Sequence, residues 1–184
     1  MDRRELIKNI VFLTGATFLG ADLFLVGCKS DKNSNFKGED IIFLDEIAET
    51  IIPKTNTPGA KDAETGKFIA RYATDCYTDS DQKILQEGLI ELDESATKKY
   101  GYSFIKITNT QKKELLTIID REAKEYQQHK EEKAPTHYFT MIKQLTLFGF
   151  FTSEAGATQV LRYNPVPGKY EGCIPYIKGE KSWS

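Results

Sequence analysis

Apolar residues recur at helical spacing through most of this chain, and no segment shows the strict alternation that is typical of a half-buried strand. Between residues 40 and 51, apolar side chains stand three or four positions apart until Pro53 interrupts the pattern. The same spacing returns in later segments up to residue 161. We therefore predict an all-α domain, with helices over residues 40–51, 68–76, 80–100, 108–133, 135–149 and 153–161.

The ends of these predicted helices carry residues that start or stop a helix. Serine and threonine start helices because their hydroxyls accept hydrogen bonds from the first free N–H groups, and glutamine three positions later completes a capping box. Proline suits the first turn, whereas glycine suits the position after the last one. The expected starts are Ser80, Thr108 with Gln111, Pro135 and Ser153, and the expected stops are Pro53, Gly101 and Gly149.

The character of the sequence changes after Asn164. Prolines at 165, 167 and 175 each remove a backbone donor and restrict the residue before them, so this stretch cannot continue a helix. We expect a single multi-helix domain that ends in an irregular, extended arm rich in proline and glycine.

The first residues carry sorting signals. Arg3 and Arg4 precede a mild apolar stretch and resemble a twin-arginine export signal, which carries folded proteins across a membrane. The stretch ends in Leu-Val-Gly-Cys, which resembles a bacterial lipobox with Cys28 as the lipidated residue. A retained membrane anchor is the alternative, but Asp22 would cost roughly 2.5–3.5 kcal/mol near the centre of a membrane helix.

These signals divide the chain into a signal peptide over residues 1–27, a lipidated polar tether over 28–37 and a helical domain over 38–184. We expect a lipid-anchored protein of the cell envelope on the periplasmic side, because two or three acyl chains on Cys28 anchor a protein stably. A domain of about 150 residues buries roughly 68–70% of its unfolded surface, so it needs no metal or disulfide to fold. The net charge of −2 gives no indication of nucleic-acid binding.

Acylation of Cys28 leaves Cys76 and Cys173. Three alternatives remain open for them: a disulfide between the two, two buried free thiols, or a link from one of them to a partner subunit. Cys76 shares a helix face with Phe68 and Tyr72, so we expect it to be packed. No Cys-x-x-Cys pair is present, so zinc clusters and thioredoxin-like chemistry lack their signatures.

The chain is poor in groups for catalysis. His129 and His137 are its only histidines; we expect His129 to be solvated and His137 to cap or pack a helix. No glycine-rich phosphate loop follows a strand. The sequence therefore predicts neither a catalytic site nor a cofactor site nor a metal site. Carboxylates on the first helix are expected on its solvent face near the start, where the helix dipole favours them; they are Asp40, Asp45, Glu46 and Glu49.

Aromatic residues crowd the last quarter of the chain. Most of them must form the domain's own core, but an extended arm with rigid prolines and exposed aromatic side chains is also a means of gripping a partner. We predict a partner interface formed by Phe150, Phe151, Glu154, Tyr163, Pro165, Pro167, Gly168 and Tyr170.

Four blocks, in order, resemble the gluconate 2-dehydrogenase subunit 3 family over about residues 40–173. The blocks are Glu49–Pro53, Thr57–Ala63, Gly149–Glu154 and Tyr163–Tyr170. The resemblance implies a small, non-catalytic subunit without a cofactor of its own. Its partner would be a large dehydrogenase subunit that holds FAD and oxidises a sugar or sugar acid, with electrons usually passing to a cytochrome c subunit.

The resemblance also implies a reason for the leader. The large subunit often lacks an export signal, so it would cross the membrane folded and bound to its small subunit, through the twin-arginine export machinery. The lipobox at Cys28 departs from many family members and suggests that the small subunit itself anchors the complex. Two alternatives remain: a stand-alone envelope lipoprotein that binds a small sugar or peptide, and an enzyme that uses His137 or a cysteine.

Overall fold

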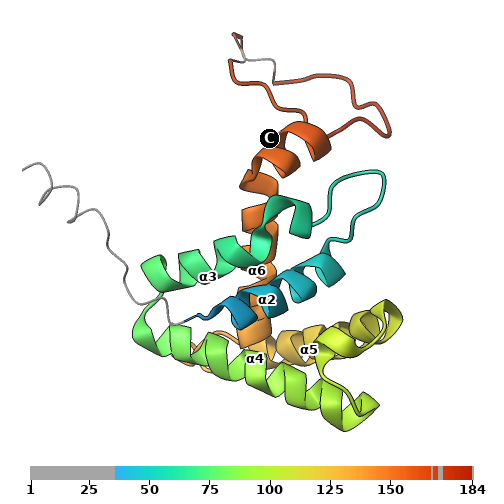
Figure 1. Ribbon diagram of the computed structural model, residues 1–184. Coiled ribbons are helices and arrows are strands. Elements are labelled where there is room, and N and C mark those ends of the chain that lie inside the picture. The colour runs from blue at the N-terminus through green and yellow to red at the C-terminus, as the bar shows by residue number, and fades with distance from the viewer. Residues whose placement is uncertain (1–35, 167, 170–171, 184) are drawn as a thin grey trace, which may run out of the picture. The chain divides into compact units, whose positions relative to one another are not determined.

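The structure is a computed structural model that describes residues 36–166, 168–169 and 172–183 (Figure 1). The chain divides into two units, Met1–Asn33 and Ser34–Ser184. The signals predicted at Arg3, Arg4 and Cys28 lie outside the described residues. The second unit is helical, which confirms the predicted fold class. Its elements are α2 (Gly38–Ile51), η1 (Lys61–Ala63), α3 (Thr65–Cys76), α4 (Asp79–Tyr100), η2 (Phe104–Lys106), α5 (Asn109–His129), α6 (Tyr138–Thr152) and η3 (Ala155–Val160).

Helix α2 begins with a capping box in which the Asp40 carboxylate accepts a hydrogen bond from the Lys37 N–H at 2.7 Å. Its buried face consists of Leu44, Ile47 and Ala48. The helix ends at Ile51, before Pro53, as the sequence predicts.

Two boundaries of α4 test the predicted caps. The helix starts after Thr78, whose hydroxyl accepts from the Asp81 N–H at 3.2 Å, so the prediction of Ser80 as the cap is wrong. Ser80 instead lies inside the first turn, 2.9 Å from the Thr78 hydroxyl. The stop is as predicted, because Gly101 has a φ of 78°, which favours glycine.

Helix α5 starts with the predicted capping box. The Thr108 hydroxyl accepts from the Gln111 N–H, and the Gln111 side chain accepts from the Thr108 N–H at 2.9 Å. The helix ends at His129, so the charged residues up to Lys133 do not extend it as predicted.

Helix α6 corrects both of its predicted ends. It starts after His137, whose Nδ1 accepts from the Phe139 N–H at 3.2 Å, rather than at Pro135. It also runs through Gly149 to Thr152. Gly149 is needed for close packing rather than as a stop, since a Cβ there would lie 2.4 Å from the Phe68 ring.

The core forms around α6, which packs against α2, α3, α4 and α5 (Figure 1). The largest fully buried side chains come from several elements: Leu44, Ile47, Ile69, Leu85, Leu92, Phe104, Phe139, Ile142 and Phe150. After α6, the Ser153 hydroxyl accepts from the Gly156 N–H at 3.0 Å, but the residue directly before the π-helical turn η3 is Glu154 rather than the predicted Ser153. Among the described residues, no helix is long and apolar enough to cross a membrane.

Candidate functional site

The loop between α2 and α3 is held by the carboxylate of Glu49. Its oxygens accept from the Lys54 N–H at 2.8 Å and from the Lys61 N–H at 2.9 Å. Gly59 lies so close that a Cβ there would meet both oxygens at 2.6 Å. The first two sequence blocks, Glu49–Pro53 and Thr57–Ala63, therefore form one structural unit.

Asp62 closes the same loop from the other side. Its carboxylate accepts from the Gly59 N–H at 3.0 Å and pairs with the Lys54 ammonium at 2.9 Å. The hydrogen bond from Lys54 lowers the pKa of Asp62. The Asp45 carboxylate holds the start of α3 by accepting from the Gly66 N–H at 2.7 Å, and partial burial raises its pKa.

Glu46 lies between two lysines, Lys61 of the loop and Lys112 of α5. The Lys112 side chain is only 6% exposed, and its ammonium lies 2.9 Å from the Glu46 carboxylate. Burial raises the pKa of Glu46, but the hydrogen bonds from both lysines outweigh it, so the net shift is downward. The predicted solvent-face position is therefore wrong for Glu46, although its role is structural.

The histidines have structural or solvated positions. His137 caps α6 and stacks on the Tyr138 ring, with centroids 4.6 Å apart. Burial lowers the pKa of His137, in keeping with a neutral ring whose Nδ1 accepts a hydrogen bond. His129 is exposed, as predicted. In the part of the chain that the structure describes, no group of His, Cys, Asp or Glu residues could hold a metal ion.

Cys76 and Cys173 are free, exposed thiols in the structure. The prediction that Cys76 is packed is therefore wrong. Cys76 is the last residue of α3, and the aromatic residues that share its helix face continue the packing without it. The disulfide between the two cysteines stays a prediction.

An aromatic cluster lies where α3 meets α6, and we call Phe68, Tyr72, Tyr77 and Phe148 the aromatic face. Phe148 meets the rings of Phe68 and Tyr72 edge-on, with centroids 5.6 and 5.8 Å apart. Phe148 is 49% exposed although it makes these contacts. Large rings that pack on one side and face solvent on the other are typical of a contact surface.

The predicted interface residues divide into three groups. Phe150 is 1% exposed and part of the core, so it is not available to a partner; this part of the prediction is corrected. Phe151 and Tyr163 keep 37% and 56% of their surface exposed. Three more are exposed, namely Glu154, Pro165 and Gly168, and two lie outside the described residues, namely Pro167 and Tyr170.

Sequence reasoning missed the contacts that close the C-terminal arm, which we define as residues 162–183. The Arg162 N–H donates to the Ser182 carbonyl at 2.7 Å, and its guanidinium lies 3.2 Å from Glu180 and 4.7 Å from the centre of the Trp183 ring. These partners are about twenty residues apart and follow no pattern that the sequence reveals. Beyond this base, the arm exposes Val166, Ile174, Tyr176 and Ile177.

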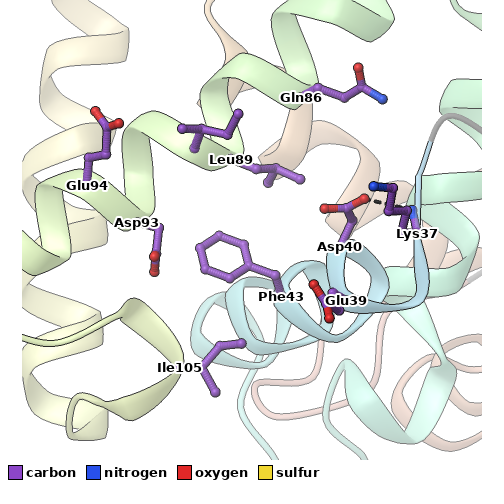
Figure 2. A pocket seen from close by; sticks show the side chains of 10 residues that line it. Lys37, Glu39, Asp40, Phe43, Gln86, Leu89, Asp93, Glu94 and Ile105 are labelled. Carbon is purple, nitrogen blue, oxygen red and sulfur yellow. Dashed lines mark hydrogen bonds between the residues drawn. The ribbon is translucent and has the colours of Figure 1, made fainter.

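Two hollows are present on the surface of the helical unit. One, of 380 Å³, lies between the α2–α3 loop and η3 and is lined mainly by polar residues. The other, of 560 Å³, lies between α2, α4 and η2; its lining side chains are shown in Figure 2. Four of them are apolar, namely Phe43, Leu89, Ile90 and Ile105.

His137, Glu46 and Asp120 serve as a helix cap and in ion pairs, whereas aromatic and apolar side chains lie exposed on α6 and the arm. This arrangement belongs to an all-α protein. A family model for gluconate 2-dehydrogenase subunit 3 matches residues 39–168, and the chain belongs to this family. The resemblance found in the sequence is thereby confirmed, and the family is that of a small subunit of a dehydrogenase complex. Comparisons with curated proteins and with solved structures found no match.

Proposed function

We propose that this chain is the non-catalytic small subunit of a periplasmic, FAD-dependent sugar or sugar-acid dehydrogenase. In this proposal the large subunit holds FAD, and a cytochrome c subunit can accept its electrons. Arg3 and Arg4 direct the folded pair through the twin-arginine machinery, and the lipid on Cys28 anchors it. The observation that carries the proposal is the family match over residues 39–168, which takes in the whole helical core.

The exposed surfaces support a binding role. Phe148 and Phe151 stand three positions apart on α6 and therefore lie on neighbouring parts of one helix surface. The arm adds exposed apolar side chains, with Val166 at 77% and Tyr176 at 87%. Aromatic side chains of this kind bury a large area on binding at a small cost in conformational entropy.

The use of the polar side chains supports a non-catalytic role. A general base must be free to take a proton from a substrate, but the His137 ring accepts a backbone hydrogen bond on one nitrogen. Glu46 and Asp120 are each shared between two lysines, which lowers the pKa of both carboxyls against the opposing effect of burial. Carboxylates of this kind stay ionised and serve as structural ties.

A pull-down from native membranes tests the proposal. Full-length chain with an affinity tag is extracted in mild detergent, and the flavin absorbance and the protein composition of the eluate are measured. We expect a large flavoprotein in proportion to the tagged chain. A colourless chain that elutes without any such partner would contradict the proposal.

A pair of variants locates the contact. Phe148→Ser removes half-exposed aromatic surface from α6, and we expect it to lower the recovered flavin about tenfold, which corresponds to about 1.4 kcal/mol of binding. Tyr102→Ser is the matched control, since Tyr102 is 64% exposed and lies outside the aromatic face and the arm. Equal losses in both variants would exclude the aromatic face as the contact.

A further inference from the structure

The hollow between α2, α4 and η2 combines an apolar lining with charged groups. Phe43, Leu89 and Ile105 line its middle (Figure 2). Ile90 also lines the hollow and is 61% exposed. Ile105 is itself 41% exposed. A volume of 560 Å³ falls within the roughly 300–1,000 Å³ of ligand sites.

Carboxylates stand at both ends of this apolar middle. Figure 2 shows Glu39 and Asp40 at one end, on α2, and Asp93 and Glu94 at the other, on α4. Lys37 is the only basic residue among those that line the hollow. The hollow is therefore apolar in the middle and negative at its two ends.

The four carboxylates differ in their own contacts. Asp40 accepts from the Lys37 N–H, and Asp93 accepts from the Phe104 N–H at 2.7 Å, so both are fixed in place by the fold. Glu39 and Glu94 form no ion pair with any residue that the structure describes, and both are exposed. Each end therefore offers one fixed carboxylate and one that is available to a cation.

We propose that this hollow binds a short segment of a partner protein that has apolar side chains in its middle and a lysine or arginine at each end. The apolar side chains would cover Ile90 and Ile105, and the cations would pair with Glu39 at one end and Glu94 at the other. Charge complementarity selects this occupant: an anion or a nucleic acid would be repelled, and a small molecule with a single cation would satisfy only one end. The surface is distinct from the aromatic face and from the arm.

Binding of a defined probe tests the proposal. The full-length chain in neutral detergent is titrated with a blocked, fluorescently labelled Lys-Leu-Leu-Leu-Lys peptide, and anisotropy is measured. The same peptide with glutamate in place of both lysines is the reference. We expect the lysine peptide to bind and the glutamate peptide to bind at least about tenfold more weakly, with a difference that shrinks as salt is raised.

Two matched double variants locate the site. Glu39→Gln with Glu94→Gln should weaken the lysine peptide about tenfold, whereas Glu131→Gln with Glu132→Gln changes the net charge equally at exposed positions outside the hollow and should leave binding unchanged. Ile90→Ser should also weaken binding. Because Ile90 is exposed, this variant is expected to unfold at the wild-type temperature, which thermal denaturation checks.

Three results would overturn the proposal. The first is that the lysine peptide does not bind, and the second is that the lysine and glutamate peptides bind equally well. The third is an equal loss of peptide affinity in the two double variants. Displacement of the peptide by butylammonium at the same concentration would show that the site takes a small cation instead.

Discussion

The α2–α3 loop and the C-terminal arm are both irregular segments that carry family sequence blocks, but they are held in different ways. The loop is tied along its length by carboxylates: Glu49 binds it at Lys54 and Lys61, and Asp62 binds it again at Gly59. The arm is tied at its base, where Arg162 meets residues 180–183.

The difference separates two uses of similar residues. Polar groups of the loop bond to one another and to Glu49 of α2, so its sequence block serves the fold. Among the described residues of the arm, Pro165, Pro175 and the large apolar side chains are exposed and available for contact with a partner. A family motif can therefore mark structure in one segment and binding in another.

The largest expected effect tests the loop. Glu49→Ala removes two hydrogen bonds from a carboxylate to backbone N–H groups, and we expect the free energy of unfolding to fall by about 2–3 kcal/mol. Chemical denaturation measures it. Glu154→Ala is the matched control at an exposed position of the third sequence block, where the change should stay within about 0.5 kcal/mol. A similar fall in the free energy of unfolding in both variants would contradict the structural role of Glu49.

An intermediate effect concerns acid. Because burial lowers the pKa of His137 in the folded protein, the unfolded chain binds more protons once the pH falls below the unperturbed value of about 6.5. Stability is therefore full above that pH and is lost as the pH falls toward the lowered value. The loss should be no more than about 1 kcal/mol, the typical worth of a helix cap.

The control for this prediction is His137→Asn, since asparagine caps a helix and does not titrate in this range. Thermal unfolding at about pH 7.5 and about pH 5.5 should show a smaller change for the variant than for the wild type. The fluorescence emission of Trp183 should change little over the same pH range, because Trp183 contacts Arg162 rather than His137. Equal pH dependence in variant and wild type would exclude His137 as the source.

The smallest expected effect on stability tests the arm. Arg162→Ala removes the cation from the Trp183 ring and the ion pair with Glu180, yet unfolding of the helical core should change by less than about 1 kcal/mol. Trp183 is the only tryptophan of the chain, so a red shift of its emission reports opening of the arm directly. Arg71→Ala, an exposed arginine on α3, is the control. An unchanged emission in Arg162→Ala would show that Arg162 does not hold the arm.

Local signals in the sequence predicted much of the fold. The caps at Thr108 and Gly101 are predictable because each cap and its hydrogen-bond partner lie within four residues of each other. Gly149 has the sequence signature of a helix stop, but its role depends on Phe68, which lies far away in the sequence. The contacts of the candidate site cannot be predicted for the same reason. The positions of these residues in the sequence give no indication that Glu49 binds Lys61 or that Arg162 contacts Trp183.

The position of α6 has a consequence for the order of folding. Four helices pack against it, yet it follows all of them in the chain, and its own buried face includes Phe139, Ile142 and Leu145. A ribosome makes the chain from the N-terminus, so the apolar faces of α2 to α5 lack their common contact until residues 138–152 have emerged. Contacts between segments far apart in sequence also form late because loop closure must come first. We therefore expect α2 and α3 to pack on each other early and the complete helical core to form only once α6 has emerged.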